Sequence, residues 1–175
     1  MVSAASGVVF KEQLVWKYLE AEEPGMVHME GEIIINRPVD VVFDFAADER
    51  NEPRYNPSML RVGKVSNGPI GLGTRFRAET TSMGRFTEMI IEFTAYERPL
   101  LLASSTHLSD MDIEGTLRFD SVGDRTRMRR PWDLKPRGVL RLMTLLIRRM
   151  GQRQEERNWE NLKDFLEAQE TPRQS

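Results

Sequence analysis

The run from Arg137 to Ala168 predicts one long C-terminal helix, and it constrains the fold more than any other part of the chain. Apolar residues in its first half recur at spacings of three and four, as they do on one face of a helix. They are Val139, Leu142, Met143, Leu146 and Met150. A helix with one apolar face requires a second layer to cover it. We therefore expect this first half to lie over the core as the lid of a cavity.

The second half of the same helix carries its apolar residues on a different face, at Leu162, Phe165 and Leu166. At about 100° per residue, the two halves of a straight helix cannot face the same wall. We expect the second half to pack over the rim of a sheet, with a bend near Gly151.

The segment from Val27 to Lys135 supplies the second layer, because it predicts one strand after another. Residues 74–81, 87–97 and 113–119 each alternate apolar and polar side chains, with a period of two. Two small helices follow the first strand, one of which begins at Pro38. The predicted class is α+β, with a curved antiparallel sheet of about seven strands wrapped around the long helix.

A chain of 175 residues can bury its own core as a single domain, which we place at 27–170 with a disordered tail at 171–175. Charged residues make up 30% of the chain, and no apolar run approaches the roughly 20 residues of a membrane span. The sequence has no cysteine, which excludes disulfides, thiolate metal sites and a cysteine nucleophile. We expect a cytoplasmic, bacterial protein.

Residues 1–26 form an N-terminal extension that differs from the rest of the chain. Phe10, Leu14 and Tyr18 recur at helical spacing, but a basic start and a sustained apolar run are missing, so this is not a secretory signal. Two interpretations stay open. The extension is a short amphipathic helix, or the native protein begins at Met26.

Four groups of residues along the chain follow the pattern of one known superfamily. They are Ile35, Pro38, Val42, Phe43 and Asp48; Asn51, Pro53, Tyr55, Asn56 and Pro57; Gly71, Gly73, Thr74 and Phe76; and Asp133, Leu134, Pro136 and Gly138. In these residues and in the order of its elements, the chain resembles the START-like (SRPBCC, Bet v 1-like) superfamily, which has the helix-grip fold. Within that superfamily it resembles the polyketide cyclase/dehydrase and lipid-transport branch.

The resemblance implies a cavity for a hydrophobic ligand between the concave face of the sheet and the long helix. The inward positions of the predicted strands agree, because they mix bulky and small side chains, and small ones leave space. The alternative is that methionines and aromatic rings fill the barrel. The residues we expect at the ligand are Tyr55, Phe76, Ala78, Met89, Ile91, Phe93, His107, Leu117, Phe119, Met128, Arg130, Trp132, Leu142, Leu146 and Met150.

Arg130 is the anomaly among these positions, because the phase of the last predicted strand turns it inward. A guanidinium among apolar residues must be paired or must reach water. Either Arg130 meets a carboxylate near the mouth of the barrel, or it points at something in a pocket.

Little in the sequence indicates catalytic chemistry. His28 and His107 both fall in predicted strands, where a lone histidine is more often structural than catalytic. No cluster has the spacing of a metal site, and the glycines between Gly68 and Gly73 lack the lysine that follows a phosphate-binding loop. We expect no metal and no cofactor. A cyclase would need a shaped pocket, a polar group to hold an enolate, and a base or a chain of water molecules.

Basic residues gather between Arg125 and Arg157, with few carboxylates among them. No aromatic residues interleave with these arginines, so the pattern does not favour a nucleic-acid platform. Three functions remain. The leading one is binding or transport of a hydrophobic small molecule or lipid. The alternatives are an enzyme of the polyketide cyclase or dehydratase type, and an interaction module that uses the basic surface to bind a ribosome, a membrane or an acidic partner.

Overall fold

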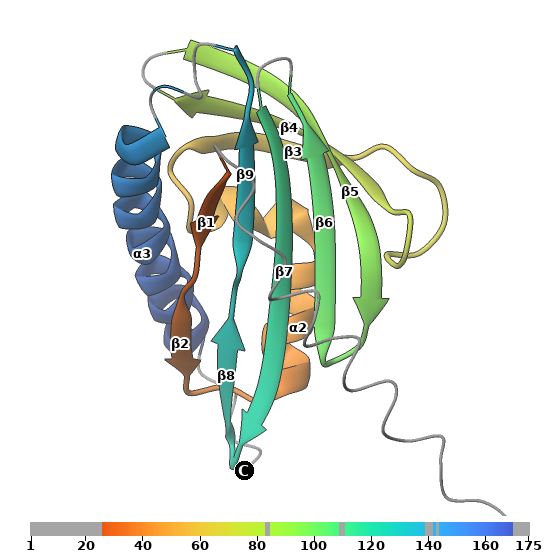
Figure 1. Cartoon of the computed structure of the whole chain (residues 1–175). Helices are drawn as coiled ribbons and strands as arrows, with labels where there is room; N and C mark the ends of the chain where they lie inside the picture. Colours follow the sequence, from red (N-terminus) through yellow and green to blue (C-terminus); the bar gives the residue numbers. More distant parts are fainter. Residues whose placement is uncertain (1–25, 83–84, 109–110, 139–141, 143, 170–175) are drawn as a thin grey trace, which may run out of the picture.

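The computed structural model describes residues 26–82, 85–108, 111–138, 142 and 144–169, which form one antiparallel sheet with helices packed against it (Figure 1). The predicted α+β class and helix-grip arrangement are confirmed. The strands are β1 Val27–Met29, β2 Glu32–Ile35, β3 Met59–Lys64, β4 Arg75–Ser82, β5 Arg85–Glu97, β6 Leu101–His107, β7 Met111–Val122, β8 Arg125–Arg129 and β9 Trp132–Pro136. The helices are α2 Val39–Ala47, the 3₁₀ helix η1 Glu49–Arg54 and α3 Thr144–Ala168.

The sheet runs in the order β1-β9-β7-β6-β5-β4-β3, with β2 paired to β8 and β8 to β7. Figure 1 shows it curving around the interior, with α3 along the side formed by β1 and β2. The short helix α2 lies against β7 and β8, and it follows Pro38 as the sequence predicts. Pro53 lies inside η1, which stays a brief 3₁₀ helix.

Two neighbouring strands of this sheet are interrupted at the same level. β1 pairs with β9 and β2 pairs with β8, and Gly31 and Arg130 lie in the gap, joined by a 3.0 Å hydrogen bond from Arg130 N to Gly31 O. Pro131 has no N–H to donate to a ladder, which accounts for the break on this side. The register is the same on both sides of the gap, from Val27 opposite Leu134 to Ile35 opposite Thr126. Because β1 and β2 share one position in the sheet and β8 and β9 share another, the nine strands fill seven positions, as predicted.

The core lies between the concave face of the sheet, α2 and the second half of α3. Phe43 of α2 is fully buried, with its ring edge-on to Phe119 at 5.1 Å and to Tyr96 at 5.3 Å between centroids. Phe76 and Ala78 of β4 are both fully buried, so the predicted inward phase of this strand is confirmed. A smaller cluster of Val27, Met29 and Leu134 lies beside it at the β1–β9 pair.

The predicted core face in the first half of the long helix is wrong for the residues that the structure describes. Leu142 is 87% exposed and Met150 is 46% exposed. α3 begins at Thr144 rather than Arg137 and continues through Gly151 to Ala168. Among the α3 side chains that the structure describes, the buried ones lie in the second half: Asn158, Trp159, Leu162 and Leu166.

Some predictions fall outside the described residues. These are the helix proposed within residues 1–26, the side chains of Val139, Met143 and Leu146, and the tail at 171–175. In the described part of the chain, no helix is long and apolar enough to span a membrane.

Candidate ligand-binding site

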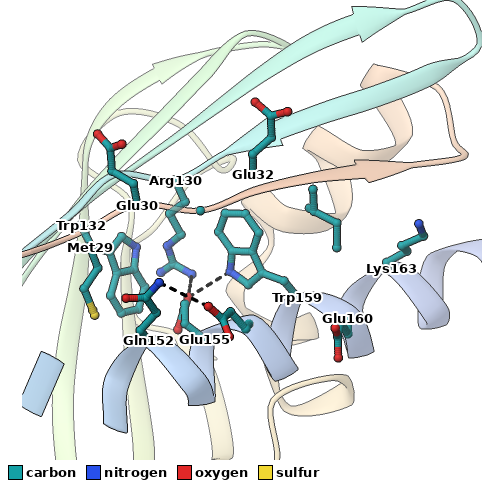
Figure 2. A pocket seen from close by; sticks show the side chains of 13 residues that line it. Met29, Glu30, Glu32, Arg130, Trp132, Gln152, Glu155, Trp159, Glu160 and Lys163 are labelled. Atoms are coloured by element: carbon teal, nitrogen blue, oxygen red, sulfur yellow. Dashed lines mark hydrogen bonds and ion pairs between the residues drawn. The ribbon is translucent and has the colours of Figure 1, made fainter. Parts of the chain in front are cut away.

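A pocket of about 340 Å³ opens where the two interrupted strands face α3 (Figure 2). The strands contribute the stretch from Met29 to Ile33 together with Arg130 and Trp132. The helix contributes residues one and two turns apart on one face, namely Gln152, Glu155, Glu156, Trp159, Glu160 and Lys163. This volume falls in the usual range for small-molecule sites. The pocket therefore owes its place to the strand break, where the sheet leaves α3 partly uncovered.

Arg130 lies at the floor of this pocket with most of its side chain covered. Its guanidinium carbon lies 3.5 Å from the centroid of the Trp132 ring. Its Nη1 donates a 2.6 Å hydrogen bond to Oε1 of Glu155 on α3, and both side chains are at least three-quarters buried. The expectation that Arg130 meets a carboxylate is confirmed. Arg130 Nε is buried without a hydrogen-bond partner in the described structure.

Glu155 links Arg130 to Trp159 at the floor of the pocket, because it accepts a second hydrogen bond. Trp159 Nε1 donates to the same Oε1 over 3.1 Å, from one turn further along α3. The Trp159 ring is 6% exposed and packs over Gly31, where an added Cβ would lie 3.5 Å from the ring. Figure 2 shows Arg130 and Trp159 converging on Glu155. One carboxylate thus links the interrupted strands to the helix.

Trp132 packs closely against Gly115, which has no side chain to block the indole. The two residues are register partners on β9 and β7. A Cβ at Gly115 would lie 3.1 Å from Trp132 Nε1, closer than nearly all real contacts of this kind. The indole therefore lies on the backbone of β7 and offers its face to Arg130. Its Nε1 is buried and has no partner among the described residues.

Three polar residues on and directly after η1, namely Glu49, Glu52 and Tyr55, form what we call the η1 group, and Arg130 lies close enough to act electrostatically on Glu49 and Tyr55. Burial raises the pKa of Glu49 well above its ordinary value, and the charge and hydrogen bond of Glu52 raise it further, while Arg130 lowers it in part. Burial also raises the pKa of Tyr55, and the charges of Glu52 and Glu49 add to that effect. The neighbouring carboxyl of Glu52 and burial thus both favour the protonated form of Glu49.

Replacing Glu49 with glutamine is expected to raise the melting temperature at neutral and mildly alkaline pH. Since the folded pKa lies above the unfolded one, the folded state binds more protons in this window, and ionisation of Glu49 costs stability as pH rises above 4.5. The advantage of Glu49→Gln should shrink as pH falls towards 4.5. Calorimetry across this range measures it.

Asp44 provides a control of opposite sign. Its hydrogen bonds to Arg98 lower the pKa of this carboxyl, so its contribution to stability is present at neutral pH and is lost as pH falls through the folded pKa. Asp44→Asn should therefore lower the melting temperature at neutral pH. If Glu49→Gln shifts it in the same direction as Asp44→Asn, the assignment of Glu49 is wrong.

The residues expected at the ligand separate into three groups. Arg130 and Trp132 line the pocket. Those in or against the buried core cluster are Tyr55, Phe76, Ala78, Met89, Ile91, Phe93, Leu117, Phe119 and Met128. His107 lies apart from both, with its side chain 75% exposed and Nδ1 2.9 Å from Oδ1 of Asp112, and Leu142 and Met150 are exposed.

Sequence reasoning missed the helix side of the pocket. Glu155 and Trp159 are four residues apart and therefore share one helix face. Trp159 also continues the buried stripe of Leu162 and Leu166. A carboxylate one turn before that stripe is the signal that could have identified the partner of Arg130.

The chemistry available at the floor is hydrogen bonding and charge. The described residues include no group of histidine and acidic side chains that could hold a metal ion. The pocket offers two indole rings, one guanidinium and one largely buried carboxylate, which suit the polar end of an apolar molecule.

The family model described as "Polyketide cyclase / dehydrase and lipid transport" matches residues 26–167. No curated protein sequence matches the chain.

Solved structures show the same fold at low sequence identity. TTHA0849 from Thermus thermophilus aligns with a TM-score of 0.71 and 20% identity over 82% of this chain and 99% of its own. The Zhui aromatase/cyclase from Streptomyces sp. R1128 aligns with a TM-score of 0.71 and 15% identity over 86% and 99%. A START superfamily protein from Mycobacterium smegmatis aligns with a TM-score of 0.68 and 11% identity over 81% and 97%.

Proposed function

Because the chain belongs to the polyketide cyclase / dehydrase and lipid transport family, we propose that it binds a hydrophobic small molecule or lipid in the pocket between the interrupted strands and α3. The family supports a role in hydrophobic ligand binding or cyclisation. Binding is the role that the pocket supports best, because its floor offers contact surface and hydrogen-bonding groups.

The observation that carries this proposal is the lining of the pocket. Two indoles, Trp132 and Trp159, line the pocket together with the apolar side chains of Met29 and Ile33 and give it rigid apolar walls. Arg130 and Glu155 supply a charged pair that would orient the polar end of a ligand. The apolar part of a ligand would lie against Met29, Ile33 and Trp159, which line the pocket.

Native mass spectrometry of the purified protein, followed by organic extraction, tests the proposal. We expect a discrete hydrophobic adduct, or a rise in melting temperature with members of a lipid and polyketide panel. A clean apo mass with no thermal shift across the panel would count against ligand binding and favour the alternative of an interaction module.

A pocket-filling variant makes this test specific. Gly31 lines the pocket, and a Gly31→Leu side chain would extend beside Trp159. We expect Gly31→Leu to lose most of the adduct. Gly63 on β3 is the matched control, because a Cβ there meets nothing within 4 Å, and Gly63→Leu should keep the adduct. Equal loss in both variants would place the ligand elsewhere.

A second candidate function, cyclase or dehydratase chemistry, is favoured by the η1 group. The raised pKa of Glu49 suits a group that delivers a proton, and Tyr55 lies in the same group near Arg130. Turnover of a poly-β-ketone substrate that is lost in Glu49→Gln, with ligand binding retained, would support the enzyme. Binding without turnover would support the carrier.

A further inference from the structure

The charged residues that line the pocket are mostly carboxylates. Two cations stand against five carboxylates, and the full set is Arg130, Lys163, Glu30, Glu32, Glu155, Glu156 and Glu160. Both cations have acidic neighbours, since Arg130 bonds Glu155 at 2.6 Å and Lys163 lies 4.0 Å from Glu167. Two of the carboxylates have basic neighbours in turn, since Glu32 lies 3.5 Å from Arg127 and Glu30 lies 3.1 Å from His28. The excess of negative charge in the lining therefore comes mainly from Glu156 and Glu160 on α3.

Glu155 has one oxygen left for a ligand. Both hydrogen bonds that it accepts, from Arg130 and Trp159, end on Oε1. The Glu155 side chain keeps 20% of its surface exposed and lines the pocket, so a ligand would reach this carboxylate through its second oxygen, Oε2. An accessible oxygen of a largely buried carboxylate favours a hydrogen-bond donor, above all a charged one.

Arg130 is poorly placed to bind an anion. Its face lies on Trp132, its Nη1 bonds Glu155 and its Nε is buried. With Nη1 engaged and Nε buried, Arg130 can offer a ligand carboxylate Nη2 alone rather than the pair of donors of a forked contact. A ligand carboxylate at the floor would also lie beside Oε2 of Glu155, where like charges repel.

We propose that this pocket selects an apolar ligand that carries a protonated amine and discriminates against fatty carboxylates. The ammonium donates a hydrogen bond to Oε2 of Glu155, while the rim glutamates Glu156 and Glu160 attract it from solution. The apolar part lies against the indole of Trp159. This inference rests on the proposed function, since it names the class of ligand for the same pocket.

Three probes of equal chain length test the inference: octylamine, octan-1-ol and sodium octanoate. Isothermal titration with the full chain at neutral pH and low salt should give octylamine a Kd at least about tenfold below that of octanoate, with octanol between them. Added salt should narrow the difference, because exposed charges at the rim are screened.

Variants of the pocket separate the effect of its charge on probe affinity from the effect of its shape. Glu155→Gln keeps an acceptor for Arg130 and Trp159 but removes the charge, so it should weaken octylamine about tenfold and strengthen octanoate. Glu156→Gln and Glu160→Gln, both at exposed positions, should each weaken octylamine about two- to fivefold. Glu92→Gln on β5, outside the pocket, is the control and should leave all three affinities unchanged.

The outcomes distinguish failure of the amine preference from failure of ligand binding itself. If octanoate binds as tightly as octylamine while octanol also binds, the amine preference is overturned and the binding role stands. If none of the three probes binds, both fail. Should Glu155→Gln unfold, the double variant Glu156→Gln/Glu160→Gln takes its place, and an unchanged amine-to-carboxylate ratio in it would overturn the preference.

Discussion

Replacing Phe43 with alanine is expected to lower the free energy of unfolding by about 3–5 kcal/mol, the usual cost of deleting a buried aromatic ring. Phe43 is fully buried, and its ring makes edge contacts with Phe119 and Tyr96, which join α2 to β7 and β5. The cavity left behind would be lined by large rings that cannot collapse easily. Urea denaturation followed by tryptophan fluorescence measures the loss.

Phe86 on β5 is the matched control, since its side chain is 82% exposed. Phe86→Ala should change the free energy of unfolding by no more than about 0.5 kcal/mol. Equal losses in the two variants would mean that α2 does not anchor the core in the way described.

Replacing Arg130 with methionine is expected to cost about 1–3 kcal/mol of stability. Breaking a fully buried ion pair costs about 3–5 kcal/mol, because it leaves a charge without a partner, and the partial exposure of Arg130 and Glu155 reduces that figure. The charge left without a partner is that of Glu155. Adding Glu155→Gln to Arg130→Met should therefore recover about 1 kcal/mol, measured in the same urea titration.

An exposed ion pair provides the comparison. Arg98 bonds Asp44 through Nε at 2.7 Å and Nη2 at 2.9 Å, with both side chains about half exposed. Arg98→Met should cost less than about 1 kcal/mol despite this bidentate geometry. If Arg130→Met costs no more than Arg98→Met, Arg130 does not stabilise the floor of the pocket.

The fold was predictable where one face of an element is buried and the other is solvated. β4 shows this directly, since Phe76 and Ala78 alternate with exposed charged residues and the period of two is visible. The face of the long helix was not predictable in the same way. Leu142 and Met150 have correct helical spacing, but spacing does not say which apolar face meets the core, and Trp159 and Leu162 take that place.

The candidate site was predictable on its strand side alone. The phase of the last strand placed Arg130 inward, and a carboxylate partner was one of the two expected solutions. Its partner Glu155 lies 25 residues away, in a helix segment rich in charged residues that looks solvated in sequence. Glu49 was missed for a related reason, because the sequence does not show that η1 folds close enough to Arg130 for the charge of Arg130 to act on Glu49.

The shared register across the gap at Gly31 and Arg130 limits how this protein can change its chain length. Because side chains alternate between faces, one residue inserted before β2 would turn Val27 and Met29 outward and bring His28 to the core side. Two inserted residues would restore the alternation and lengthen only the opening beside α3. Descendants of this sequence should therefore tolerate paired insertions at the pocket mouth and reject single ones, so that the width of the entrance varies in steps of two residues.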